Sequence, residues 1–289
     1  MMKVVWIVSG FVLLLLAGCL REEYRGDDCL RDEHFVMKDI PYVFVGKEAV
    51  DYRPYYTFVE QLDLFVFSEQ RLGQYASYNF VYCREHPVIT REVDDNSRDA
   101  LFVANLYSPK ELQWNFRTGH LEAVFSILDY EEPPVLLAAI TDIASRRDSV
   151  PVELRLMVSR LEIHLVNPPS WLVGLDVRVH NIAGTVSTDY VLGDTTHIHK
   201  ALFFDHQGSG TYLFGVNTFP TYSGKAALLE ITPLGMSGTA PILVEDESLH
   251  FLPGVITRME MVYDADEKIT ISIRSDDKWE VMDGGSIII

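Results

Sequence analysis

Three histidines are the first residues whose spacing suggests chemistry. His197 and His199 are two residues apart, which would place both side chains on one side of a β-strand, and His206 follows soon after. Such imidazoles bind zinc, copper or nickel if a third ligand, His206 or Asp205, arrives from a neighbouring strand. The alternative is ordinary exposed strand histidines, because this spacing is common by chance. We predict no metal site and no cofactor.

Serine, glycine and carboxylate patterns do not predict catalysis. The Gly-Met-Ser-Gly segment at Gly235–Gly238 lacks the G-x-S-x-G spacing that lifts a nucleophilic serine out of a sheet. The glycines at 208 and 210 precede a strand and offer no helix N-terminus to a phosphate. The acidic segment Asp94–Asp99 lacks the glycine and terminal glutamate of a calcium loop. We therefore predict that the chain is not an enzyme.

The three cysteines have different surroundings. Cys19 directly follows an apolar segment, whereas Cys29 and Cys83 lie in the polar chain beyond it. In an exported protein the last two can form a disulfide; the alternative is two buried free thiols. Neither belongs to a C-x-x-C pair, so redox and zinc functions are not indicated. We keep Cys29–Cys83 as a possible disulfide.

The chain begins with a predicted export signal. Lys3 precedes the apolar segment Val4–Ala17, which is shorter than the ~20 residues of a membrane-spanning helix. The segment ends in Leu-Ala-Gly-Cys at Leu16–Cys19, which resembles the lipobox of bacterial lipoproteins. This resemblance implies that residues 1–18 are removed and that Cys19 is acylated on its sulfur and its new amino group. Acyl chains on Cys19 would anchor the protein in the outer membrane.

An acidic tether follows the lipidation site. The segment Leu20–Glu23 has the sequence Leu-Arg-Glu-Glu and resembles the signal that displays lipoproteins on the outer surface of Bacteroidetes cells. The alternative is attachment to the inward-facing leaflet. We expect a lipid-anchored protein of the cell outer membrane that is exposed at the surface.

The composition excludes several classes of protein. The 289 residues are 48% hydrophobic, enough to fill the cores of about two domains. With 24 Lys and Arg against 42 Asp and Glu, the net charge of −18 repels nucleic-acid phosphates. We expect a globular chain with no nucleic-acid partner.

Alternation of period two predicts β-strands along most of the chain. Leu62–Val66, Leu175–His180 and Ile269–Arg274 alternate in the manner of half-buried strands. Amphipathic segments long enough for crossover helices are missing, so antiparallel sandwiches are favoured over an α/β sheet. The one helical candidate is a short connecting turn at Pro109–Trp114, with Ser108 as its N-cap.

Two β-sandwich domains account for these strands. The polar segment Ser145–Ser149 predicts a boundary that separates an N-terminal domain, 29–147, from a C-terminal domain, 148–289, after a tether at 19–28. The apolar positions change phase between Val158 and Leu161. This change predicts a bulge near Ser159, or a strand that passes from one sheet to another.

Four segments follow the lipobox cysteine along the chain: Asp27–Cys29, Leu62–Glu69, Leu101–Leu106 and Leu156–Ile163. Their order and spacing resemble those of the FimB-type fimbrial anchor family of Bacteroidetes. The resemblance runs from Cys19 to the end of the chain. It implies an all-β fold of two tandem transthyretin-like antiparallel β-sandwich domains. It also implies a lipidated anchor or minor subunit that joins a fimbrial stem subunit by β-strand exchange.

The chain end is the predicted donor strand. Ile287, Ile288 and Ile289 form a β-prone apolar end after the glycine pair at 284–285. The alternative is that these residues complete the protein's own sheet. A different function, that of a surface adhesin binding glycans or a host, requires an exposed aromatic platform, for which Tyr52, Tyr55 and Tyr56 form the candidate cluster.

Overall fold

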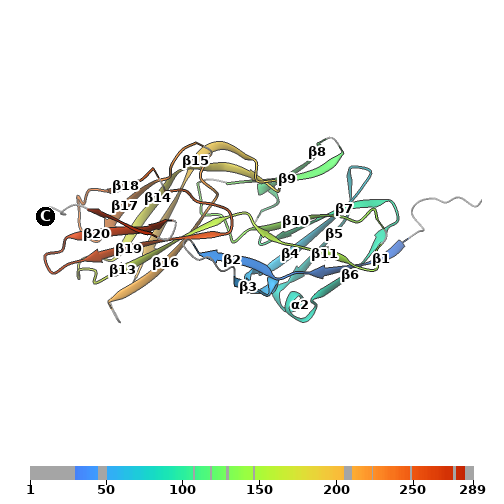
Figure 1. Ribbon diagram of the computed structural model, residues 1–289, viewed down its shortest axis with the longest axis horizontal. Helices are drawn as coiled ribbons and strands as arrows, with labels where there is room; N and C mark the ends of the chain where they lie inside the picture. The colour runs from blue at the N-terminus through green and yellow to red at the C-terminus, as the bar shows by residue number, and fades with distance from the viewer. Residues whose placement is uncertain are drawn as a thin grey trace, which may run out of the picture.

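The structure is a computed structural model that describes residues 30–44, 51–106, 108–117, 119–127, 130–145, 147–204, 210–222, 224–247, 249–275 and 278–283. Figure 1 shows an elongated molecule with β1 (Leu30–Met37) at one end and β20 (Ile269–Ser275) towards the other. Nearly all regular elements are strands, and most strand pairs are antiparallel. The predicted all-β sandwich fold is confirmed.

Two sheets form the N-terminal sandwich. Their strand orders are β11-β1-β6 and β12-β10-β7-β4-β5. The strands besides β1 are β4 (Gln61–Ser68), β5 (Arg71–Asn79), β6 (Val88–Asp94), β7 (Ser97–Ala104), β10 (Leu137–Asp142), β11 (Val150–Val152) and β12 (Arg155–Leu156). The core between the sheets contains Phe35, Ile89 and Phe102, all fully buried, and the rings of Phe35 and Phe102 meet edge to face at 5.0 Å.

The C-terminal sandwich has the same two-layer arrangement. In one sheet β19 lies between β13 and β20, with β16 and β21 outside them; in the other β14 lies between β15 and β17, with β18 beyond β17. The bounds are β13 (Ser159–Val166), β14 (Gly174–Ser187), β15 (Leu192–Phe203), β16 (Thr211–Thr218), β17 (Leu228–Leu234), β18 (Ile242–Glu245), β19 (Val255–Tyr263) and β21 (Lys278–Asp283). Ile163, Val177 and Met259 are fully buried in its core.

Two hairpins of the N-terminal half add strands to the C-terminal sheets. They are β2 (Ile40–Phe44) with β3 (Asp51–Arg53), and β8 (Leu112–Arg117) with β9 (His120–Ser126). β2 pairs with β19 in parallel, Val43 opposite Val255, and β9 pairs with β14, Phe125 opposite Val186. A third core that includes Phe125 and Phe219 fills the junction. In the described part of the chain these hairpins pair with the C-terminal sheets, whereas side chains such as Ile40 and Leu112 pack them against the N-terminal sandwich.

Burial on the strands follows the alternation where one face is open to solvent. In β14 the side chains of Leu175, Val177 and Val179 are buried and that of Arg178 is exposed, as predicted. The expectation of a half-buried strand is wrong for β4, where Phe65 and its neighbours on both faces are buried. The β8–β9 hairpin covers the second face, which local alternation cannot reveal.

The chain changes sheets where the apolar phase changes. β12 pairs with β10 in the N-terminal sandwich, and β13 pairs with β16 and β19 in the C-terminal one. The predicted passage between sheets is confirmed. The last residue of the N-terminal core is Leu154 and the first of the C-terminal core is Leu161. The domain boundary at 147–148 stays a prediction, and β11 and β12, which follow it in sequence, pair with N-terminal strands.

Helices are short. Pro109–Glu111 is a single 3-10 turn whose Lys110 N–H is bonded to the Ser108 hydroxyl at 3.3 Å, and strand β8 begins at once, so the predicted turn ends before Trp114. The six-residue helix α2 (Phe80–Glu85) was not predicted. Its N-cap is Asn79, whose side chain accepts a hydrogen bond from the Tyr82 N–H at 2.9 Å.

Candidate functional site

Two of the three histidines, His197 and His199, lie in the described part of the chain, where each contacts a side chain of its own. His197 stacks on Tyr130 with ring centroids 4.4 Å apart, and His199 pairs with Asp176 at 2.5 Å; His206 and Asp205 lie outside the described residues. Burial, followed by the neighbouring positive charge of His180, lowers the pKa of His197. Among the residues that the structure describes, no group of three or more His, Cys, Asp or Glu side chains is arranged to hold a metal ion.

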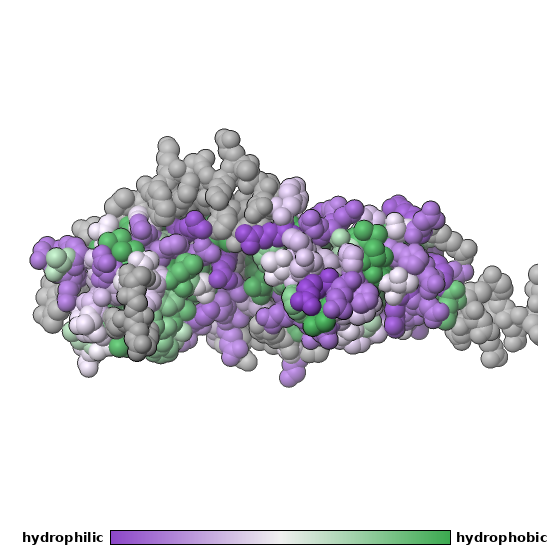
Figure 2. Space-filling view, turned by 90° about the horizontal axis from the view of Figure 1, so that it is seen from below, coloured by the Kyte–Doolittle hydropathy of each residue, from purple (hydrophilic) through white to green (hydrophobic). Residues whose placement is uncertain are grey.

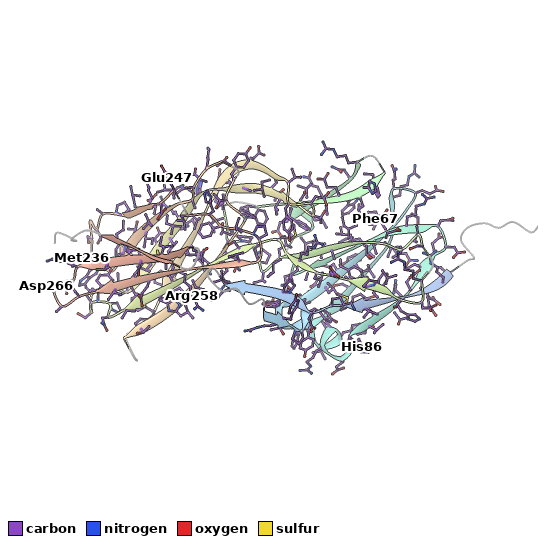
Figure 3. The ribbon with its side chains drawn as sticks, in the orientation of Figure 1. Phe67, His86, Met236, Glu247, Arg258 and Asp266 are labelled. Atoms are coloured by element: carbon purple, nitrogen blue, oxygen red, sulfur yellow. The ribbon has the colours of Figure 1, made fainter. Side chains whose placement is uncertain are left out.

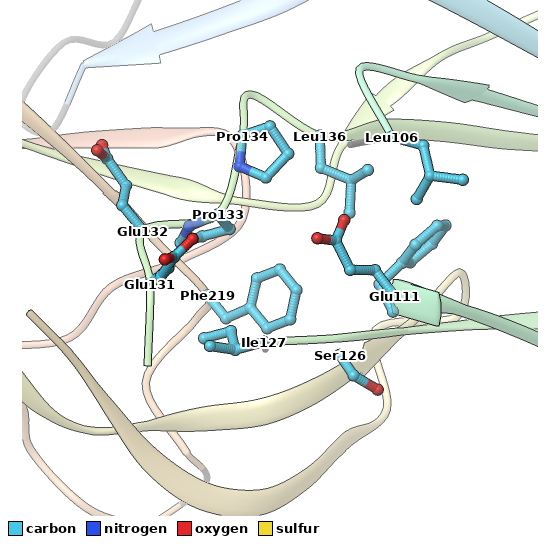
Figure 4. A pocket seen from close by; sticks show the side chains of 11 residues that line it. Leu106, Glu111, Ser126, Ile127, Glu131, Glu132, Pro133, Pro134, Leu136 and Phe219 are labelled. Carbon is cyan, nitrogen blue, oxygen red and sulfur yellow. The ribbon is translucent and has the colours of Figure 1, made fainter. Parts of the chain in front are cut away.

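A crevice between the sandwiches is too small for a substrate. Its volume is about 50 Å³, whereas small-molecule sites usually have ~300–1,000 Å³. Figure 4 shows the Phe219 ring in the crevice, with Pro134 and Leu136 above it and the Glu111 carboxylate beside it. The crevice is a packing seam of the junction between the sandwiches.

The segment that closes this seam binds to the C-terminal sheets. Glu132 accepts a hydrogen bond from the Asn217 N–H at 2.6 Å and forms an ion pair with Lys200. The side-chain amide of Asn217 donates to the Pro133 carbonyl at 3.3 Å, and the Tyr130 carbonyl accepts a hydrogen bond from the His199 backbone N–H at 3.0 Å. Bonds to two different strands, β15 and β16, therefore fix this connecting segment.

Asn105 links the end of β7 to two other segments. Its backbone has φ 63°, a left-handed conformation that asparagine tolerates better than most residues. The side-chain oxygen accepts from the N–H groups of Glu60, at 2.7 Å, and Gln61, at 3.4 Å. The side-chain nitrogen donates to the carbonyls of Phe58 and Val135, both at 2.7 Å. No sequence pattern singles out Asn105, whose one signal is its position directly after an apolar strand.

We expect Asn105→Ala to lower the free energy of unfolding by about 3 kcal/mol, because it leaves buried backbone groups unbonded and places alanine at positive φ. Urea unfolding of the purified protein measures the change. Asn115→Ala, at an exposed position of β8, is the control and should cost less than ~0.5 kcal/mol. A loss below ~1 kcal/mol for the Asn105 variant would contradict the role assigned to its side chain.

Arg31 stabilises the end of the molecule where β1 starts. Its guanidinium donates to the carbonyls of Asp95, at 2.9 Å, Ser97, at 3.3 Å, and Ile143, and it pairs with Glu33 at 2.6 Å. Glu33 is 2% exposed, so this ion pair is largely shielded from water. Arg31 therefore attaches the start of β1 to the β6–β7 turn and to the end of β10.

The strand register places the end of β21, the last described strand, at the opposite end of the molecule. Val255, at the start of β19, pairs with β2 near the junction, while Tyr263, at its other end, pairs with Ile269. Thr270 in turn pairs with Asp283, the last residue of β21. Within the described residues β21 pairs with β20 alone. The described chain thus ends on an edge strand, remote from Leu30.

The residues predicted for lipidation and strand donation, Cys19 and Ile287–Ile289, lie outside the described residues, and so does Cys29. Cys83 is fully buried in α2, and within the described residues no other cysteine is bonded to it. As a thiol it has a pKa raised by burial to about 11, which makes it a poor nucleophile at neutral pH. The Cys29–Cys83 disulfide stays a prediction.

The tyrosine cluster does not form a platform. Tyr55 is buried, and its hydroxyl donates to the Cys83 carbonyl at 2.6 Å and the His86 carbonyl at 3.1 Å. Tyr56 meets Tyr55 edge to face at 6.0 Å, and Tyr52 is exposed on β3. Two of the three tyrosines therefore pack in the sandwich.

No helix in the described part of the chain has the length and apolar character needed to cross a membrane. No family model and no curated protein matches the sequence.

Solved structures match over nearly the whole chain. A structure assigned as a polysaccharide-binding protein of Bacteroides thetaiotaomicron has TM-score 0.55 and 11% identity, with 89% of this chain and 98% of that chain covered. One assigned as an adhesin of Bacteroides ovatus has TM-score 0.53 and 13% identity, with 90% and 97% covered. The likeness is one of fold. The fimbrial anchor protein Mfa2 of Porphyromonas gingivalis also matches, with TM-score 0.48, 11% identity and 87% and 99% covered.

Proposed function

We propose that this chain is a lipid-anchored subunit of a surface fimbria, attached to the outer membrane through Cys19 and joined to a stem subunit by β-strand exchange. The observation that carries the proposal is the separation of the two ends. Leu30, eleven residues after Cys19, begins β1 at one end, and β21 finishes at the other (Figure 1). At ~3.3 Å per strand residue, the path through β1, β2 and β19 is on the order of 70 Å long.

The junction between the sandwiches suits a subunit that connects a membrane to a polymer. Strand pairs β2–β19 and β9–β14 attach two hairpins of the N-terminal half to the C-terminal sheets, and Glu132 adds bonds to β15 and β16. A flexible linker would let the two ends move independently, whereas these strand pairs and the packed core of the junction hold them in one orientation.

Edge strands support the proposed mode of assembly. An unpaired strand edge presents N–H and C=O groups that an extended segment of another chain can bond. β21 is such an edge within the described residues, and Ile287–Ile289 follow it in sequence. We propose that this terminal segment is donated to the stem subunit. The two Bacteroides neighbours, one assigned as an adhesin and one as a polysaccharide-binding protein, are consistent with an adhesive role.

A pull-down from gently detergent-extracted cells tests the proposal. We expect a repeating fimbrial subunit to co-purify with the tagged full-length protein in an amount that exceeds the bait. The tag belongs in an exposed loop and not at Ile289, so that it does not block the proposed donor segment. Recovery of the bait alone, from cells shown to carry fimbriae, would favour a free-standing adhesin instead.

A further inference from the structure

An aromatic surface that no sequence pattern predicted lies over Phe65 of β4 and consists of Tyr75 and Trp114. Tyr75 on β5 is 52% exposed and Trp114 on β8 is 39% exposed. Both rings rest on Phe65, with centroids 5.1 and 5.7 Å from it, and Trp114 also meets Phe67 at 5.7 Å, near the label of Phe67 in Figure 3. The buried rings hold the two exposed ones in place, so little side-chain entropy is left to lose on binding.

Polar groups border this aromatic surface. The Tyr75 hydroxyl donates to Asp63 Oδ1 at 2.8 Å, and the side-chain amide of Gln61 donates to both Asp63 oxygens, at 3.1 and 3.2 Å. Asp63 is 3% exposed, whereas Gln61 is exposed next to it. Burial, aided by the Asp63 hydrogen bond, raises the pKa of Tyr75, which keeps its hydroxyl protonated. The surface therefore combines fixed rings with hydrogen-bonding groups at one edge.

The size of the surface favours a small ligand over a protein. An aromatic side chain has about 150–250 Å² of surface, so the exposed parts of Tyr75 and Trp114 amount to roughly 200 Å². A stable protein interface needs ~800 Å² from each partner. The net charge of −18 disfavours anionic ligands. A neutral ligand with one apolar face and several hydroxyls fits these conditions.

We propose that Tyr75 and Trp114 form a binding site for neutral oligosaccharides. The C–H face of a pyranose ring stacks on the Trp114 indole, because its polarised hydrogens meet the negative face of the aromatic system. The adjoining sugar contacts Tyr75, and its hydroxyls bond the Gln61 amide at the border. The site lies between β5 of the N-terminal sandwich and the β8–β9 hairpin, away from β21, so a fimbrial subunit of this kind would bind glycans independently of its attachment to the stem.

The test is isothermal titration calorimetry of the purified full-length protein with cellohexaose, xylohexaose, mannohexaose and N-acetylchitohexaose. We expect at least one of these probes to bind, and Trp114→Ala and Tyr75→Ala each to weaken its binding at least tenfold. Trp114→Phe, which keeps a ring, should retain most of the affinity. Tyr52→Ala, which removes an exposed tyrosine on β3, is the matched control and should bind as the wild type does.

Two outcomes would overturn the proposal: no binding of any of the four probes, or binding that Trp114→Ala and Tyr75→Ala leave unchanged. Thermal unfolding of each variant identifies one that fails to fold, and either single variant suffices for the test. If Trp114→Ala instead removes a co-purifying protein, the surface is a protein contact and the oligosaccharide site is wrong. That result would leave the fimbrial proposal in place, so the two failures are distinguishable.

Discussion

Replacing Cys19 by alanine should release the fimbriae from the cells. Acyl chains contribute ~0.8 kcal/mol per buried CH₂, and two or three of them make attachment long-lived. Without them, nothing proposed here holds the subunit to the bilayer. We expect most fimbrial protein in the culture medium, measured by immunoblotting of cells against supernatant.

The design must separate attachment from export, because the resemblance to a lipobox implies that cleavage itself depends on Cys19. The Cys19→Ala chain is therefore placed behind a signal peptide that ordinary signal peptidase removes. Tyr24→Ala, five residues further along the same tether, is the control and should keep its fimbriae on the cells. Fimbriae that remain cell-bound in the Cys19 variant would count decisively against the anchor.

Deleting Gly284–Ile289 should break the connection to the stem while the protein itself remains at the cell surface. Burying an isoleucine contributes about 1.5–3 kcal/mol, so three of them contribute at least ~4 kcal/mol, or roughly a thousandfold in affinity. We expect co-purification of the stem subunit to fall at least tenfold in the pull-down described above.

The alternation of side chains along a strand allows a more specific form of this experiment. In an extended strand Ile287 and Ile289 point to one side and Ile288 to the other. The double substitution Ile287→Asp with Ile289→Asp and the single substitution Ile288→Asp should therefore weaken stem binding by different amounts. If the segment completes the protein's own sheet instead, the deletion lowers the free energy of unfolding of the isolated protein and leaves stem binding intact.

The strand content of the molecule follows from local sequence, because side-chain alternation is a property of neighbouring residues. Leu175, Val177 and Val179 are buried as their spacing predicts. The phase change before Leu161 correctly indicates a passage between sheets, because one shifted residue exchanges the two faces of a strand.

Burial by segments distant in sequence, and pairing with them, could not be predicted in the same way. Phe65 is buried by a hairpin more than forty residues later in the chain, and the pairing of Val43 with Val255 joins segments far apart in sequence. Neither relation leaves a local pattern. The aromatic surface at Trp114 was missed for the same reason, whereas Tyr52, Tyr55 and Tyr56 are adjacent in sequence but do not form one surface.

The way in which β1 enters the fold determines how the protein would respond to pulling. Seven residue pairs join β1 to β6, and three join it to β11. The β1–β6 pair is antiparallel, and its hydrogen bonds run perpendicular to the strands, so a force applied along β1 from the membrane side shears these seven pairs together. A force across the strand would peel them apart one by one. Arg31 adds hydrogen bonds at the start of β1. Tension between the cell and its fimbriae would therefore act along β1, the direction in which its strand pairs resist separation best.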